Sequence, residues 1–387
     1  MDLALKKGKC ILFANSDWYL YNFRLATMRA LRCSGYDVVI LSPTGAYVER
    51  MEREGFRHVV APLSRRSVNP FRELSLLLWL WRFLRKERPA VVHGFTIKCA
   101  VYGALIGKAA GVPCRIAAIA GMGLTFTHRK GACAWLRWSV KRLMAFSFSG
   151  KGTIVVTQNG DDAAEILNSR VADPASVFVI RGSGVDLERF RPRRRVVSRN
   201  EPLKVIFASR LLWSKGIGEY IEAAQELKQK GHNAEFYLAG TVDSSNPGSC
   251  KQADVDAWHK EGVVAWLGHR EDMASLLRKM DVMVLPSYYR EGVPKCLLEA
   301  AATGLAIVTT DMPGCRDVVS ESGRNGLQVP PRDAAAVLEC IVELDGDREY
   351  CAQLGREARR HAEMHFDERL VVSRTLALYP SVAGYVD

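Results

Sequence analysis

The sequence has no apolar segment long enough to cross a membrane as a helix, because none approaches the roughly 18–20 uncharged residues that such a helix needs. The apolar run from Cys10 to Ala14 follows three lysines but is too short for a signal peptide. That run is better interpreted as a first β-strand. These absences favour a cytoplasmic protein without a membrane-spanning helix.

Patterned cysteines are also missing. The ten cysteines are scattered, with no Cys-x-x-Cys pair and no Cys/His spacing of a zinc site. We interpret them as reduced thiols of a cytosolic protein. The sequence also has no internal repeat and no low-complexity segment, which excludes solenoid and fibrous folds.

Basic charge and ordinary globular composition are present instead. The chain has 387 residues, enough for two domains, and its 48% hydrophobic and 25% charged residues are typical of globular proteins. Lysine and arginine (54) outnumber aspartate and glutamate (42), for a formal net charge of +12. This charge favours acidic partners, among which nucleic acid, nucleotide substrates and anionic lipid all qualify.

Strand-like and helix-like stretches alternate through the chain. Continuous Val/Ile/Leu strands in this rhythm predict parallel sheets covered by helices on both faces. Ligands of such sheets bind outside the carboxyl ends of the strands. In the first part, strands are expected at 10–14, 37–42, 59–62, 90–93, 115–120 and 153–157, and helices at 23–34, 46–54, 70–88 and 100–110. In the second, strands are expected at 203–208, 235–239, 263–267, 282–285 and 306–309, and helices at 218–229, 272–279, 294–303 and much of 334–378.

The stretch from Ser287 to Glu299 has the most informative pattern. It follows an apolar strand, and Pro294 suits the first turn of a helix that ends before Gly304. Glu291 then lies in the loop, and Glu299 lies on the helix about 7.5 Å from its start. The helix N-terminus between them suits a phosphate, and two flanking carboxylates suit the hydroxyls of a sugar and a ribose. The alternative is a capped surface helix with scattered acids.

The spacing Glu-x7-Glu, with Gly-Val-Pro after the first Glu and Glu-Ala-Ala-Ala-x-Gly at the second, resembles the signature of the family 4 retaining glycosyltransferases. The Gly-Val-Asp-x-x-x-Phe-x-Pro segment at 184–192 resembles the opening of that family's second domain. The resemblance covers essentially the whole chain and implies an α/β fold of the GT-B type, with two Rossmann-like parallel-sheet domains facing a cleft and C-terminal helices. The expected domains are 1–182 for the acceptor and 183–367 for the nucleotide-sugar donor, with a helix at about 368–387 packing back on the first.

Two cations follow the expected strand 203–208. Arg210 and Lys215 are placed to neutralise a diphosphate, and they match the family's Arg…Lys-Gly motif. A solvated loop pair is the alternative. Because a nucleotide sugar breaks into an oxocarbenium-like sugar and a departing diphosphate, stabilising the leaving group is the main catalytic task.

The resemblance also implies roles for other residues at the donor. Glu291 would hydrogen-bond the transferred sugar, and Glu299 the ribose. Gly240 would let the backbone approach the donor closely, and His269 would contribute backbone near the base. The remaining donor-binding candidates at the helix start are Gly292, Val293 and Pro294.

No metal or other cofactor is expected. No Asp-x-Asp motif stands where a metal-dependent transferase would place it, and Asp161-Asp162 is better explained as capping a helix.

For the acceptor, the first domain offers several candidates. The family often has a histidine after its fifth strand, but the corresponding stretch, 118–125, has none. His93 is the remaining catalytic candidate, and a structural histidine is an equally good interpretation. Lys98 is a candidate for the acceptor's phosphate. The other acceptor-binding candidates lie in strand-to-helix loops and at the first helix: Asn15, Ser16, Asp17, Arg24 and Gly121.

Two stretches combine cations with aromatic side chains. One is 74–81, which contains Trp79 and Trp81 and is followed by four basic residues. The other is 129–151, which has six basic residues, no acids, Trp135 and Trp138. These features fit a peripheral helix on an anionic membrane surface, and a core helix with a solvated basic face is the alternative.

The stretches 15–24, 62–70 and 93–98 together resemble one bacterial branch of the family, which extends undecaprenyl-diphosphate-linked saccharides. The resemblance implies a retaining transferase that moves a hexose or N-acetylhexosamine, from a UDP-sugar, to a polyprenyl-diphosphate-linked acceptor in surface polysaccharide or glycan assembly. It would act on the inner face of the cytoplasmic membrane. A UDP-N-acetylglucosamine 2-epimerase-like enzyme of the same architecture is the alternative, and no nucleic-acid partner is expected.

Overall fold

The structure is a computed structural model that describes residues 7–64, 69–122, 133–192 and 201–380. The chain divides into two compact units. Unit 1 comprises Met1–Ser183 together with Arg369–Asp387, and unit 2 comprises Gly184–Glu368. These limits lie within one residue of the expected domain boundaries.

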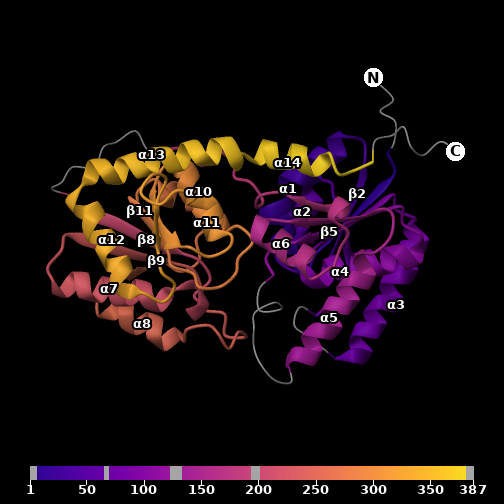
Figure 1. Ribbon diagram of the computed structural model, residues 1–387, viewed down its shortest axis with the longest axis horizontal. Helices are drawn as coiled ribbons and strands as arrows, with labels where there is room; N and C mark the ends of the chain where they lie inside the picture. Colours follow the sequence, from indigo (N-terminus) through magenta and orange to yellow (C-terminus); the bar gives the residue numbers. More distant parts are fainter. Residues whose placement is uncertain (1–6, 65–68, 123–132, 193–200, 381–387) are drawn as a thin grey trace. The chain divides into compact units, whose positions relative to one another are not determined.

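Unit 1 is built on a seven-stranded sheet in the order β3-β2-β1-β4-β5-β6-β7, with every neighbouring pair parallel. Figure 1 shows this sheet in the indigo and magenta part of the chain. Its strands are β1 (Lys9–Phe13), β2 (Asp37–Ser42), β3 (Arg57–Val60), β4 (Val91–Phe95), β5 (Cys114–Ile119), β6 (Thr153–Thr157) and β7 (Val177–Val179).

Helices cover both faces of this sheet because its side chains alternate between two apolar clusters. Cys10 and Leu12 of β1 face the cluster under α1, whereas Ile11 and Phe13 face the cluster under α3. The helices are α1 (Asp17–Cys33), α2 (Val48–Arg53), α3 (Pro70–Glu87), α4 (Thr96–Ala110), α5 (Cys133–Phe148), α6 (Gly160–Asn168) and α14 (Glu368–Leu376), with a 3₁₀ turn η2 (Pro174–Ser176).

The C-terminal segment packs on unit 1, as its Val371 and Tyr379 join the cluster under α1. The helix there is shorter than the expected 368–387, and residues 381–387 lie outside the described part of the chain. No helix in the described ranges is both long and apolar enough to span a membrane.

Two expected boundaries in unit 1 are wrong in ways that affect the site. The strand expected to end at His93 continues to Phe95, so His93 is the middle residue of β4. The helix expected from 23 begins at Asp17, because the Ser16 side chain caps it by accepting from the Tyr19 amide at 3.3 Å. Asp17 is therefore a helical residue and not a loop residue, and Arg24 lies in the middle of the helix.

Unit 2 has a six-stranded parallel sheet in the order β10-β9-β8-β11-β12-β13. The strands are β8 (Leu203–Ala208), β9 (Ala234–Ala239), β10 (Ala265–Trp266), β11 (Val282–Leu285), β12 (Ala306–Thr310) and β13 (Leu327–Val329). Around it lie η3 (Trp213–Lys215), α7 (Ile217–Gln229), α8 (Gln252–Lys260), α9 (Met273–Leu277), α10 (Lys295–Thr303), α11 (Cys315–Val318), α12 (Ala334–Gly346) and α13 (Arg348–His365).

The strand order of unit 2 reverses between β8 and β11, which are neighbours in the sheet although far apart in sequence. Such a reversal is where open parallel sheets bind their ligands, outside the carboxyl ends of the strands. The loops that leave β8 and β11 carry Lys215 and Glu291, so the fold places the expected donor residues at this switch point.

Candidate active site

The loops after β8 and β11 lie directly against each other. Ser214 offers its carbonyl to the Tyr288 amide at 3.1 Å and to the Ser287 hydroxyl at 3.2 Å. Gly216 has a φ of 81°, and a Cβ atom there would lie 2.2 Å from the Pro286 carbonyl oxygen. Only glycine permits this approach, which is the physical reason for the Lys-Gly pair.

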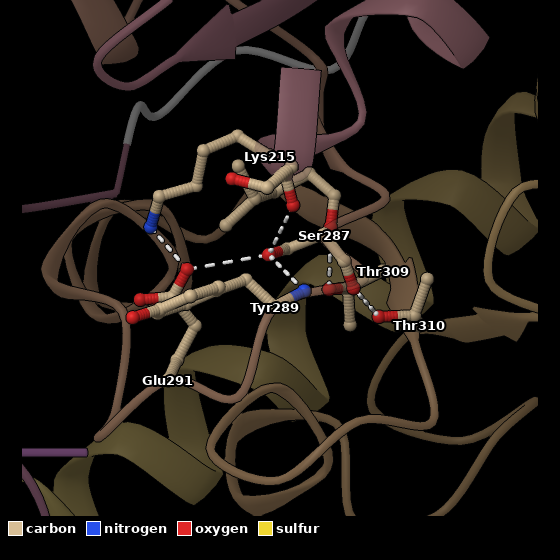
Figure 2. Close-up of polar contacts among 8 residues, drawn as sticks. Lys215, Ser287, Tyr289, Glu291, Thr309 and Thr310 are labelled. Carbon is tan, nitrogen blue, oxygen red and sulfur yellow. Dashed lines mark hydrogen bonds and ion pairs between the residues drawn. The ribbon is translucent and has the colours of Figure 1, made fainter. Parts of the chain in front are cut away.

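Lys215 and Glu291 form an ion pair across these two loops, as Figure 2 shows. Their side chains are only 9% and 14% exposed. The Ser287 hydroxyl, which the Ser214 carbonyl also contacts, lies within hydrogen-bonding distance of the same Glu291 oxygen at 3.2 Å. Because one partner alone would be a buried, uncompensated charge, the pair holds both side chains in place.

The β12 side of the site fixes the Glu291 loop from the other direction. Thr310 donates to the Ser287 carbonyl, and the Glu291 amide donates to the Pro313 carbonyl at 3.3 Å. Gly314 has a φ of 84°, and a Cβ atom there would lie 1.8 Å from the Gly292 carbonyl oxygen. Figure 2 shows Ser287 between Glu291 and Thr310, in contact with both.

α10 begins immediately after this loop. Pro294 is its N-cap residue and provides no side-chain cap, and the first turn has no acidic residue. The buried residues Gly292, Val293 and Pro294 therefore lead into a helix N-terminus that suits an anion.

Glu299 lies half-buried on α10. Burial raises the pKa of its carboxyl group, and the nearby Lys295 and Arg189 oppose that shift. Within the described residues, no hydrogen bond to its carboxylate is found. The group is thus free to accept hydrogen bonds from hydroxyls.

Gly240 joins three strand ends of unit 2. It has a φ of 148°, and a Cβ atom there would lie 1.9 Å from the Ser209 carbonyl oxygen. Its amide donates to the Gly268 carbonyl at 2.8 Å, next to the exposed His269. Arg210 follows Ser209 and is exposed, and its side chain has no ion pair or hydrogen bond in the described part of the chain.

In unit 1, two of the expected acceptor residues have structural partners. Ser16 caps α1, and Asp17 accepts a hydrogen bond from the Tyr47 amide at 2.7 Å. Asp17 is only 6% exposed, and this contact ties α1 to the loop after β2. Asn15 and Gly121 lie half-buried after β1 and β5.

Lys98 is already engaged with a carboxylate. Its amino group lies 2.7 Å from Glu73 and donates to the Ser64 carbonyl at 3.0 Å. Ser64 and Glu73 both line a cavity of about 480 Å³ beside the ends of β2 and β3. A phosphate on Lys98 would have to compete with Glu73 for the cation.

His93 is 2% exposed, and its Nδ1 lies 2.6 Å from the Tyr379 hydroxyl. Its ring stacks on Phe95 with centroids 4.1 Å apart. Burial lowers the pKa of His93 well below its usual value, and the positive charge of Arg24 lowers it further. A neutral histidine in mid-strand, covered by Tyr379, favours the structural interpretation that the sequence left open.

Asn159, and not the expected Asp161-Asp162 pair, caps α6, since its side chain accepts from the Asp162 amide at 2.7 Å. The two aspartates belong to the first helical turn. Across the described residues, no three His, Cys, Asp or Glu side chains gather as a metal site requires.

Two family models match the chain. The glycosyl transferase 4-like domain matches residues 23–182, within unit 1, and the model described as "Glycosyl transferases group 1" matches residues 202–347, within unit 2. Together they include most of both sheets. Both models describe glycosyltransferase domains, so the chain is a glycosyltransferase.

Curated relatives of this glycosyltransferase are similar over most of their length. The N,N'-diacetylbacillosaminyl-diphospho-undecaprenol alpha-1,3-N-acetylgalactosaminyltransferase of Campylobacter jejuni is 29% identical over 94% of this chain and 96% of the relative. The UDP-Gal:alpha-D-GlcNAc-diphosphoundecaprenol alpha-1,3-galactosyltransferase of Escherichia coli is 24% identical over 76% of each.

Solved structures agree with the GT-B fold. A glycosyltransferase from Rickettsia africae matches with a TM-score of 0.76 at 17% identity, over 98% of this chain and 99% of that one. The Anabaena protein HepE, in complex with UDP and glucose, matches with a TM-score of 0.75 at 17% identity, over 96% and 98%. The matched families and named relatives are transferases, so the epimerase alternative has no support.

In this glycosyltransferase, the structure brings together Lys215, Glu291 and the start of α10, and leaves Arg210 and His269 exposed nearby. Sequence reasoning missed Ser287, which links the two loops, and Gly314, which supports Glu291. A serine and a glycine outside a recognised motif carry no local signal for such contacts.

Proposed function

We propose that the enzyme transfers a hexose or N-acetylhexosamine from a nucleotide sugar, with UDP as the nucleotide, to a saccharide linked to polyprenyl diphosphate. The anomeric configuration of the sugar is retained, as the family resemblance implies. The observation that carries the proposal is the buried Lys215–Glu291 pair at the switch point of unit 2. The names of the Campylobacter jejuni and Escherichia coli relatives, which specify diphosphoundecaprenol-linked saccharides, support the acceptor class.

The donor would be held by unit 2 in two parts. Glu299 accepts hydrogen bonds from the ribose hydroxyls with its free carboxylate. Glu291 accepts from a hydroxyl of the transferred sugar, while Lys215 faces the diphosphate. Because Gly240 has no side chain, the donor can approach the backbone at the end of β9 closely.

Bond breaking requires that the departing diphosphate be stabilised. Lys215 supplies a positive charge that is already fixed before the reaction, because Glu291 and the closely packed loops hold it. Arg210 adds a guanidinium fork from the same loop, and the N-terminus of α10 adds its dipole. Such preorganised charge is often the largest catalytic term. No step in this scheme needs a metal ion.

The acceptor's lipid would bring unit 1 to a membrane surface. α3 exposes a stripe of apolar side chains at helical spacing, namely Phe71 (82%), Leu74 (56%), Leu78 (47%) and Trp81 (40%). Its opposite face, with Leu76, Leu80 and Leu84, is buried in the core. A helix whose exposed face is this apolar fits the interface of a bilayer.

The charges on α3 favour an anionic surface. Arg82, Arg85 and Lys86 are exposed, whereas both acids of the helix are engaged by cations. Glu73 pairs with Lys98, and Glu87 pairs with Lys9 and Arg57. The exposed charge of the helix is therefore positive, which attracts anionic lipid.

α5 has the same chemistry. Trp138 and Phe146 are 56% and 62% exposed. Arg142 lies 5.1 Å from the Trp138 ring centroid, and Lys108 of α4 lies 5.1 Å from that of Phe146. α3 and α5 both lie beside α4 (Figure 1). The side chain of Trp135 lies outside the described part.

We place the enzyme peripherally on the cytoplasmic face of the membrane.

The test is a screen of UDP-sugars against extracted lipid-linked saccharides, read as UDP release by the purified enzyme. Release that requires both a particular UDP-sugar and a lipid-linked acceptor is expected. UDP release of equal rate without the acceptor, or none with any pair, would contradict the proposal.

A further inference from the structure

Arg24 is a buried cation without an acid. It lies on α1, is 5% exposed, and donates from Nη2 to the Tyr19 hydroxyl at 3.0 Å. Its Nε is buried without a hydrogen-bond partner. No carboxylate within the described ranges forms an ion pair with it. Burying a charge without an opposite charge is costly, so Arg24 lowers the stability of the fold in the absence of a ligand.

Aromatic rings hold the guanidinium in place. Its central carbon lies 4.8 Å from the Phe95 ring centroid and 5.7 Å from that of Tyr19. Stacking of this kind positions an arginine but leaves the N–H donors in the plane of the guanidinium able to bind another group. The structure therefore fixes the orientation of Arg24 but does not neutralise its charge.

The Phe95 ring that holds this cation belongs to the residue at a helix N-terminus. Phe95 ends β4 and is the N-cap residue of α4, a helix of 15 residues with no side-chain cap and no acid in its first turn. Thr96, the next residue, has a φ of 69°, which is strained for a β-branched residue. Gly94 lets the first turn of α4 lie against the strand, as a Cβ atom there would be 2.2 Å from the Cys99 carbonyl oxygen.

The other charged groups nearby do not complete this site. Lys98 in the first turn of α4 is engaged by Glu73, and His93 stays neutral because burial and Arg24 both lower its pKa. An unneutralised guanidinium beside an uncapped helix N-terminus is an arrangement that binds a phosphate. The expected phosphate ligand Lys98 is thus a weaker candidate than Arg24.

We propose that Arg24 and the N-terminus of α4 bind the diphosphate group of the lipid-linked acceptor. This inference rests on the proposed function for the identity of the acceptor. The diphosphate supplies the negative charge that Arg24 lacks, and the guanidinium fork holds two of its oxygens. A diphosphate also occurs in the donor, so the experiment must separate the two sources.

The experiment is calorimetric titration of the full-length enzyme with inorganic pyrophosphate, in the presence of saturating UDP to occupy the donor site. Pyrophosphate is expected to bind the wild type and to bind Arg24→Met at least tenfold more weakly. Arg29→Met is the matched control, because Arg29 lies on the same helix, is exposed and pairs with Glu54 at 2.6 Å. Equal affinity of the wild type and Arg24→Met would overturn the inference.

Stability separates a binding role from a structural one. Without ligand, Arg24→Met is expected to melt at or above the wild-type temperature, because it removes an uncompensated buried charge. A lower melting temperature together with unchanged pyrophosphate affinity would show that Arg24 only supports the fold. Should Arg24→Met fail to fold, Arg24→Lys keeps the charge without the fork. It is expected to bind pyrophosphate several-fold more weakly, and wild-type affinity would overturn the inference.

Kinetics separate the two sources of diphosphate. In Arg24→Lys, KM for the lipid-linked acceptor is expected to rise while KM for the UDP-sugar and the affinity for UDP stay unchanged. A loss of UDP affinity instead would assign Arg24 to the donor and overturn the inference. If the wild type binds UDP and pyrophosphate but transfers no sugar to any lipid-linked acceptor, the proposed function fails, and the diphosphate site remains measurable.

Discussion

The two sheets carry their site cations in different ways. At the switch point of unit 2, Lys215 is paired with Glu291 and fixed by two close-packed glycines, Gly216 and Gly314. At the β4 end of unit 1, Arg24 is equally buried but has no acid. The first arrangement keeps a charge fixed without any ligand, as catalysis on a leaving group requires. The second leaves a charge to be neutralised by the molecule that binds, as recognition of an anionic acceptor requires.

Removing the paired cation is expected to have the largest effect. Lys215→Ala should lower kcat by about 10²–10³-fold, because it removes a fixed stabiliser of the departing diphosphate. It should also lower the melting temperature, since Glu291 then loses its ion pair with Lys215. Steady-state kinetics and thermal unfolding measure both. Lys230→Ala, which breaks an exposed pair with Glu226, is the control.

A double variant tests the pairing itself. Adding Glu291→Gln to Lys215→Met should recover stability relative to Lys215→Met alone, while activity stays low. Near-normal turnover in the Lys215 variants would show that the leaving group departs elsewhere.

Arg210→Ala is the exposed counterpart of the Lys215 change. We expect a rate loss of up to about 10²–10³-fold with no change in melting temperature, because Arg210 is exposed and unpaired in the described structure. The losses from Arg210→Ala and Lys215→Ala should not add, as both cations act on one diphosphate. Unchanged kinetics in Arg210→Ala would remove this side chain from the site.

Glu299 should give unit 2 a pH-dependent affinity for UDP. Its carboxylate must be ionised to accept two ribose hydroxyls, and burial raises its pKa. UDP affinity should therefore fall by about tenfold in total as pH drops through the raised pKa of Glu299. The fall should occur at a higher pH than it would for a glutamate with an ordinary pKa. The stability of the protein without UDP should depend on pH in the opposite sense. Because the pKa of Glu299 is higher in the folded than in the unfolded state, the free energy of unfolding falls as pH rises from the unfolded-state pKa to the folded-state pKa.

Glu299→Gln should remove both pH effects and weaken UDP binding near neutral pH. Calorimetric titration with UDP between acidic and neutral pH measures this. Wild-type affinity and wild-type pH dependence in the variant would contradict the assignment to the ribose.

The membrane surface of unit 1 should give the smallest effect, because many side chains share it. Replacing Phe71 and Trp81 by serine should reduce binding to anionic vesicles several-fold, and high salt should weaken the remainder by screening the cations. UDP affinity should be unchanged. Vesicle co-sedimentation measures the first and calorimetry the second. Phe178→Ser and Val179→Ser, at exposed positions on β7, are the controls, and equal vesicle binding by both pairs would contradict the proposal.

Much of the fold was predictable because its strands are short, apolar and bounded by turn residues. The strands β2, β6, β8 and β11 have the predicted bounds. The strands β7 and β13 and the helices α8 and α11 were missed, since three to nine residues of mixed character carry weak periodicity. The end of β4 was predicted two residues too early, because Gly94 resembles a strand end although α4 packs against it.

The candidate site was predictable where a motif fixed it and unpredictable where long-range packing did. The spacing of Glu291 and Glu299 placed one on the loop and one on the helix, as the structure has them. That Lys98 is engaged by Glu73, and that Tyr379 covers His93 from 286 positions away in the chain, depends on contacts that no local pattern contains. The lack of an acid at Arg24 is likewise visible only in the folded chain.

Product analysis tests the central claim most directly. Purified enzyme is incubated with one UDP-sugar, a lipid-linked saccharide and EDTA, and the lipid fraction is examined by mass spectrometry. We predict an acceptor extended by a single sugar, at the same rate without EDTA, and no such product from Lys215→Ala in the same time. An unchanged acceptor with the UDP-sugar consumed or isomerised would contradict the account, and a product formed only when magnesium is restored would contradict its metal-free mechanism.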